Sequence, residues 1–79
     1  MRLEILGPGC KRCQLLAENT KAAVAELGID AEVVKVEDVA AIMAYGVLQT
    51  PALVVDGQVR LSGHIATPAQ IGRILAEAR

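Results

Sequence analysis

Two cysteines three positions apart, Cys10 and Cys13, are the residues of this chain best suited to chemistry, and Lys11 and Arg12 lie between them. A thiolate attacks a disulfide through a mixed-disulfide intermediate, so two thiols within reach of each other can carry out thiol–disulfide exchange. A purely structural bridge is not expected, because closing so small a ring would stabilise the fold by only ~2 kcal/mol. The spacing therefore predicts a redox-active pair.

A strand-to-helix junction is predicted around the pair. Residues 3–6 form a short apolar run that meets Gly-Pro-Gly at residues 7–9, which is typical of a strand and its end. Residues 11–27 carry apolar side chains at helical spacing, and Gly28 supplies the expected stop. Cys10 therefore directly follows the strand and opens the helix.

This placement predicts different roles for the two sulfurs. Unpaired N–H groups at a helix N-terminus stabilise negative charge, so the pKa of Cys10 is expected to lie below that of a free cysteine, and Cys10 is predicted to be the attacking thiolate. Lys11 and Arg12 are predicted to tune this pKa in the same direction. Cys13 lies one turn later on the apolar stripe of the helix, so it is expected to be buried and to resolve the mixed disulfide.

One further strand and two further helices are predicted from the local pattern. Residues 31–36 are rich in valine, as expected of a strand. The acidic residues 37–38 suit the start of a second helix, which Gly46 ends. Residues 67–70, Thr-Pro-Ala-Gln, combine a cap, a proline at the first helical position and a capping-box glutamine, and they predict a closing helix.

A β-hairpin is predicted late in the chain. Residues 52–55 and 58–62 flank Asp56-Gly57, which is the strongest local signal for a two-residue hairpin turn. Thr50-Pro51 comes directly before the first of these strands, and only an X-Pro bond is a plausible site for a cis peptide. Because roughly 95% of X-Pro bonds in folded proteins are trans, the residues alone leave the isomer open.

The element order β-α-β-α-β-β-α predicts one α/β domain over residues 1–79. A right-handed crossover makes the first two strands parallel neighbours, and the hairpin adds an antiparallel pair. The strands are apolar enough to be covered on both sides. We therefore expect a four-stranded mixed sheet with helices on both faces.

Three stretches make the chain resemble the thioredoxin superfamily, and within it the short thioredoxin-like or glutaredoxin-like redox-disulfide proteins. They are Gly-Pro-Gly-Cys-Lys-Arg-Cys at residues 7–13, Thr-Pro and the hairpin at residues 50–57, and Ser-Gly at residues 62–63. In element order, the resemblance covers nearly the whole chain. It implies a thioredoxin-like fold and thiol–disulfide oxidoreductase activity.

The resemblance also implies roles for individual residues. Cys10 would be the nucleophile and Cys13 the resolving thiol. Pro51 would be cis, and Thr50 would present its backbone to the substrate. Gly63 would allow another chain to approach closely.

The chain departs from thioredoxin proper at the cysteine pair. Gly9 stands where an aromatic residue precedes the pair, and Lys11 and Arg12 replace the residues between the cysteines. The reducing power of thioredoxin is therefore not carried over. Because a basic pair stabilises the thiolate of the reduced form, we expect a more oxidising protein than an otherwise equal neutral pair would give.

The predicted function is electron transfer by dithiol–disulfide exchange, with no cofactor. A protein or low-molecular-weight disulfide is the expected substrate, a dithiol reductase the expected partner, and a monomer the expected state. The alternative is a thiolate module that binds a soft metal, a metalloid or an iron–sulfur cluster across a dimer. A tetrahedral site needs four ligands, whereas one chain offers two thiols and His64.

Composition excludes other classes of function. The net charge is −1 and the acidic and basic residues are mixed along the chain, so neither a basic face nor nucleic-acid binding is expected. No apolar run approaches the roughly 20 residues that cross a bilayer, and the N-terminus does not resemble a signal peptide. The predicted location is cytoplasmic, without a membrane.

Glu4 is the one acidic residue within the first predicted strand. A buried carboxylate there could relay a proton to Cys13. A carboxylate that faces an edge or a loop is the favoured alternative, because burial of an unpaired charge is costly.

Overall fold

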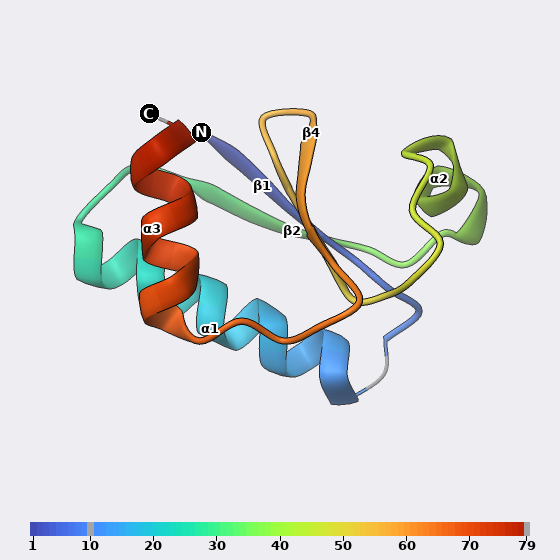
Figure 1. Cartoon of the computed structure of the whole chain (residues 1–79), viewed down its shortest axis with the longest axis horizontal. Helices are drawn as coiled ribbons and strands as arrows, with labels where there is room; N and C mark the ends of the chain where they lie inside the picture. Colours follow the sequence, from blue (N-terminus) through green and yellow to red (C-terminus); the bar gives the residue numbers. More distant parts are fainter. Residues whose placement is uncertain (10, 79) are drawn as a thin grey trace.

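The computed structural model describes residues 1–9 and 11–78, and it confirms the predicted element order (Figure 1). Most element boundaries agree with the prediction to within one residue. The elements are β1 (Arg2–Leu6), α1 (Lys11–Leu27), β2 (Glu32–Val36), α2 (Val39–Ala44), β3 (Ala52–Val55), β4 (Gln58–Ser62) and α3 (Pro68–Ala78).

The start of α2 differs from the prediction. Glu37 lies before the helix, and Asp38 is its N-cap residue, so the first turn itself contains no acidic side chain. The Asp38 side chain makes no capping hydrogen bond, although its carbonyl accepts the first helical bond from Ile42 N at 3.0 Å. The two acids therefore precede the helix rather than form its first turn, which leaves Glu37 beside the end of β2.

The four strands form one mixed sheet in the order β2-β1-β3-β4. β1 pairs with β2 in parallel and with β3 in antiparallel orientation, while β3 and β4 form the predicted hairpin. Asp56 and Gly57 both have positive φ, at 48° and 86°, as a tight hairpin turn requires. β1 and β3 are therefore the central strands, and all four residues of β3 are buried.

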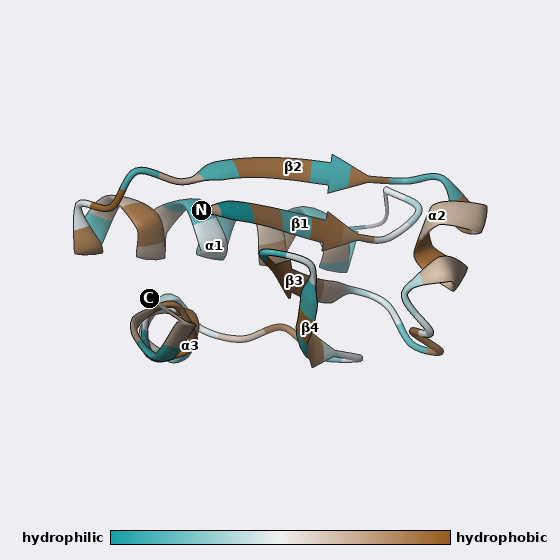
Figure 2. Cartoon of the chain, turned by 90° about the horizontal axis from the view of Figure 1, so that it is seen from above, coloured by the Kyte–Doolittle hydropathy of each residue, from teal (hydrophilic) through white to brown (hydrophobic). Residues whose placement is uncertain are grey.

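Helices cover both faces of the sheet, as expected. α2 stands apart from α1 and α3 in both views (Figures 1 and 2). The larger core cluster joins one face of β1 and β3 to α1 and α3, and includes Leu3, Ile5, Leu16, Leu53, Val55, Ile71 and Leu75. The smaller cluster joins the opposite face to α2, through Leu6, Ile42, Ala52 and Val54. None of the helices in residues 1–9 and 11–78 is long and apolar enough to span a membrane.

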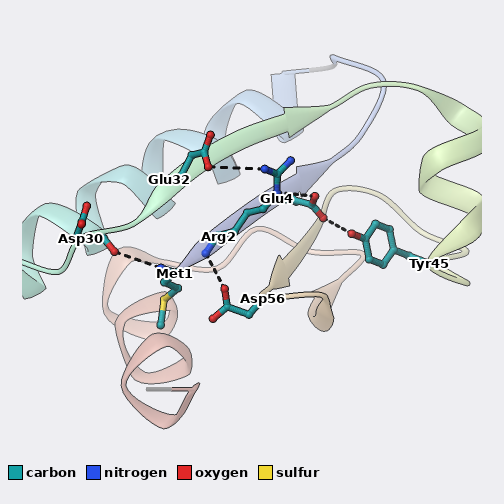
Figure 3. A network of polar contacts seen from close by, with 7 residues as sticks. All are labelled: Met1, Arg2, Glu4, Asp30, Glu32, Tyr45 and Asp56. Atoms are coloured by element: carbon teal, nitrogen blue, oxygen red, sulfur yellow. Dashed lines mark hydrogen bonds and ion pairs between the residues drawn. The ribbon is translucent and has the colours of Figure 1, made fainter.

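A polar network lies on the face of the sheet that carries α2 (Figure 3). The Tyr45 hydroxyl donates to Glu4 Oε2, and Arg2 Nε donates to Glu4 Oε1 at 3.2 Å. Arg2 also pairs with Glu32 across the parallel strands, at 3.7 Å. Glu4 lies on a central strand, so it does not face an edge of the sheet; it faces Tyr45, in the turn that follows α2. Two partners compensate the carboxylate, whose side chain is 12% exposed.

The network changes the titration of Tyr45. The hydrogen bond to Glu4, burial, and repulsion by the Glu4 charge raise the pKa of Tyr45 above its ordinary value of 10.0, while Arg2 acts in the opposite direction. A raised pKa in the folded state stabilises the fold fully below about pH 10. This contribution is lost as the pH rises from there through the folded-state pKa.

We predict that Glu4→Gln lowers the pKa of Tyr45 towards its ordinary value, because the carboxylate is the main cause of the shift. Tyr45 is the only tyrosine and there is no tryptophan, so an ultraviolet absorbance titration of the folded protein reports this group alone. Glu32→Gln is the matched control: it removes the other acid bonded to Arg2 and should leave the pKa close to that of the parent. Equal titration of all three proteins would contradict the assignment.

Candidate active site

Cys13 lies in the first turn of α1 and is 5% exposed, which confirms its predicted burial. It shares the buried stripe of the helix with Leu16, Ala17 and Thr20. Cys10 is outside the described residues, so its position and its lowered pKa stay predictions. α1 begins at Lys11, close behind the end of β1 at Leu6. The predicted strand-to-helix junction is therefore present.

Gly7 makes room for the sulfur of Cys13. A Cβ atom on Gly7 would overlap Cys13 Sγ and would lie 3.1 Å from Cys13 Cβ and 3.9 Å from Thr50 Cβ. The sulfur thus packs against bare backbone at the junction, and Thr50 approaches the same point. The sequence analysis used this glycine only as the end of a strand, although a glycine three residues before the cysteine pair was an available signal.

The Thr50-Pro51 peptide bond is cis, as the resemblance implied. Pro51 is buried and Thr50 is half-buried. The carbonyl of Pro51 accepts a hydrogen bond from Gly63 N at 2.9 Å, which extends the β3–β4 ladder one pair beyond Ala52 and Ser62. The structure therefore brings Thr50, Pro51 and Gly63 together near Cys13.

Gly63 has a close neighbour within the chain. Its φ is +82°, a conformation that favours glycine. A Cβ atom there would overlap Gln49 Oε1 and lie 3.2 Å from both Gln49 Cβ and Gln49 Cδ. Gln49 was not among the predicted site residues, and the close approach of another chain to Gly63 stays a prediction.

Lys11 and Arg12 lie in different surroundings although both are exposed. Arg12 Nη2 donates to the carbonyl of Gly63 at 3.1 Å, across 51 positions of sequence. Lys11 makes no hydrogen bond or ion pair with the other residues that the structure describes. Their joint effect on the pKa of Cys10 stays a prediction, but only Arg12 bridges the start of α1 to the loop that follows β4.

A pocket of about 180 Å³ opens beside Cys13, between residues 7–9 and the end of β2. Gln14, Lys35 and Glu37 supply polar side chains to its lining. Glu4 is not part of this lining, and its carboxylate is bonded to Tyr45 and Arg2 instead. The proton relay from Glu4 to Cys13 therefore has no support in the geometry.

Metal-binding groups are sparse in the described part of the chain. Across residues 1–9 and 11–78, no cluster of three or more histidine, cysteine, aspartate or glutamate side chains could hold a metal ion. His64 is exposed in the loop before α3, and it lines a separate hollow with Gln70 and Arg73.

We predict that Gly7→Ala destabilises the protein by about 1–3 kcal/mol, the usual effect of an inserted methyl group in a packed site. The new methyl group would overlap Cys13 Sγ. Gly72→Ala is the matched control, because nothing lies within 4 Å of a Cβ atom there. In the helix α3 this change should stabilise by roughly 0.5–1 kcal/mol. Urea denaturation of the reduced proteins measures both effects.

Repeating Gly7→Ala in a Cys13→Ala background tests whether the clash with the Cys13 sulfur causes the loss of stability. Removing the sulfur should recover part of the stability that Gly7→Ala loses. An equal loss in both backgrounds would show that Gly7 is constrained by something other than Cys13.

Comparison with known proteins agrees with this geometry. The family described as "Thioredoxin domain" matches residues 1–76. A thioredoxin of Methanothermobacter thermautotrophicus is 41% identical over 76 residues, which cover 96% of this chain and 99% of that protein. A thioredoxin of Methanocaldococcus jannaschii is 44% identical over 69 residues, covering 87% and 79%. The chain therefore belongs to the thioredoxin family and is a thioredoxin-type thiol–disulfide oxidoreductase.

Proposed function

We propose that Cys10 is the attacking thiolate of this oxidoreductase and Cys13 its resolving thiol. The observation that carries the proposal is the burial of Cys13 against Gly7, close to Thr50 and the cis Pro51. A buried sulfur is poorly placed to meet a substrate first, but well placed to attack a bond formed next to it. The burial of Cys13 is therefore the reason to assign the first attack to Cys10 and the second to Cys13.

The exchange balances in two steps. The Cys10 thiolate attacks one sulfur of the substrate disulfide, forming a Cys10–substrate disulfide and releasing the other substrate sulfur as a thiolate. Cys13 then loses its proton and attacks the Cys10 sulfur, so that a Cys10–Cys13 disulfide forms and the second substrate sulfur leaves. The substrate gains two electrons and the pair loses two, and a dithiol reductant must restore the pair.

Substrate binding is proposed at Thr50, Pro51 and Gly63. The hydrogen bond between Gly63 and Pro51 joins the two loops of this site, and Thr50 lies next to the Gly7–Cys13 contact. Membership of the thioredoxin family implies disulfide substrates and a reductase. A protein or low-molecular-weight substrate, a dithiol reductase, a monomeric state and a cytoplasmic location stay predictions.

We predict that Cys13→Ser accumulates mixed disulfides when the reduced protein meets a protein disulfide such as insulin. The first step still runs, but the resolving thiol is missing. Intact-mass spectrometry and non-reducing gels measure the adducts, with Cys10→Ser as the matched control that should form none. Adducts on Cys10→Ser, or none on Cys13→Ser, would contradict the assigned order.

The alternative role as a metal or cluster module across a dimer has a separate readout. Bound metal at half an equivalent per chain, together with a dimeric mass, would support that alternative and contradict the redox proposal. A metal-free protein whose two thiols disappear on oxidation supports the redox proposal.

We also predict that replacing Lys11 and Arg12 together by alanine makes the reduction potential more negative. Positive charge near Cys10 stabilises the thiolate of the reduced form, so its removal favours the disulfide. We expect a shift on the order of 10–30 mV, which corresponds to about 0.5–1.4 kcal/mol for a two-electron couple. Equilibration with glutathione measures it, and a potential equal to or above that of the parent would refute the charge effect.

A further inference from the structure

Gly63 is held by three contacts from two segments, the first turn of α1 and the loop before β3. Its N–H donates to the carbonyl of Pro51 at 2.9 Å, and its own carbonyl accepts from Arg12 Nη2 at 3.1 Å. The side chain of Gln49 packs against its Cα, where a Cβ atom would collide. The backbone next to the cis proline is therefore fixed by a side chain from the cysteine motif and by another from the loop before β3.

The loop between β4 and α3 is tied to α1 at both ends. Arg12 bonds the carbonyl of Gly63, and Asn19 Nδ2 bonds the carbonyl of Ala66 at 2.9 Å. Positions 12 and 19 are seven residues apart, so both side chains leave the same side of the helix. Since Asn19 anchors the end next to α3, loss of the Arg12 bond would release only the end next to Pro51.

We infer that Arg12 and Gln49 are positioning residues that hold the Gly63 backbone as one wall of the substrate groove, and so select for disulfides carried on a polypeptide chain. This inference rests on the proposed binding of substrate at Thr50, Pro51 and Gly63. A polypeptide that flanks a disulfide must lie along this backbone. A small disulfide needs only the reacting sulfur atoms.

The physical reason is preorganisation. If the Gly63 backbone is already fixed, it loses little conformational entropy when a polypeptide binds against it. A mobile backbone would have to be ordered on binding, and this entropy cost would lower the affinity. Loss of the Arg12 bond or of the Gln49 contact should therefore weaken binding of protein disulfides. Gln49 is neutral and lies outside the cysteine motif, so its loss should change the rate at saturation little. A change in that rate caused by the lost charge of Arg12 should appear in Lys11→Gln as well.

The charge of Arg12 must be separated from its hydrogen bond. Lys11→Gln and Arg12→Gln each remove one positive charge at adjacent positions, so an effect through charge alone predicts similar changes in both variants. Gln49→Ala carries no charge change at all. The positioning role predicts that Arg12→Gln and Gln49→Ala share a defect that Lys11→Gln lacks.

The experiment measures kcat and KM for insulin and for a small aromatic disulfide in each variant, together with the reduction potential. We expect Arg12→Gln and Gln49→Ala to raise KM for insulin by about three- to tenfold, the usual range for one hydrogen bond or contact. KM for the small disulfide should stay within about twofold. Gln49→Ala should keep the parent's reduction potential. Lys21→Gln and Gln58→Ala, both exposed and outside the groove, serve as controls for charge and side-chain loss.

Coupling gives a second readout. If both side chains hold the same backbone, the double variant Arg12→Gln/Gln49→Ala should raise KM for insulin by less than the product of the single effects. Multiplicative effects would overturn the shared role.

Three further outcomes would overturn the inference. One is equal behaviour of Arg12→Gln and Lys11→Gln, and another is a parallel loss for both substrates. The third is a lower KM for insulin in Gln49→Ala, which would mean that this side chain obstructs the groove. Failure of the proposed function is distinguishable, because the parent itself would then reduce neither substrate.

Discussion

The sulfur of Cys13 occupies space that a side chain at position 7 would fill, and the geometry of the site depends on this contact. Because Gly7 follows the central strand β1 and Cys13 lies in the first turn of α1, the contact sets how closely the helix approaches the end of the sheet. Thr50 enters from the loop before β3 and reaches the same point. The start of α1 and the distant loop before β3 thus converge on one glycine, and a side chain there would push them apart.

The sheet order explains why the convergence occurs at one end. β1 and β3 are antiparallel neighbours, so the C-terminal end of β1 lies beside the N-terminal end of β3. The cysteine motif follows the first, and the cis Pro51 precedes the second. β4 then runs back along β3 and delivers Gly63 to Pro51. The directions of the strands therefore explain why the cysteine motif and the proposed substrate groove lie at the same end of the sheet.

Local patterns predicted the elements well because each is encoded by neighbouring residues. The helical stripe that contains Cys13 predicted both α1 and the burial of that sulfur, and Asp56-Gly57 predicted the hairpin. The partners of Glu4 were predicted less well. Arg2 is a local partner, two residues away on the same strand, whereas Tyr45 is 41 positions away and reaches Glu4 only when α2 has packed on the sheet.

Contacts between distant residues were even harder to predict at the candidate active site. Gln49 carries no local signal, and its proximity to Gly63 arises only through the β3–β4 hairpin. The bond from Arg12 to Gly63 spans 51 positions and needs the whole sheet to form. Spacing predicted which residues do chemistry, whereas it gave no sign of the contacts that Arg12 and Gln49 make with Gly63.

Arg12 can serve both the charge of the site and its shape. A guanidinium that donates to a neutral carbonyl keeps its full positive charge, so the bond to Gly63 leaves its electrostatic effect in place while it fixes the direction of the side chain. Lys11, with no described partner to fix it, contributes charge from a flexible stem. The two basic residues between the cysteines are thus not equivalent. The role proposed for Lys11 is electrostatic alone, whereas Arg12 also bonds the Gly63 backbone, against which a substrate is proposed to lie.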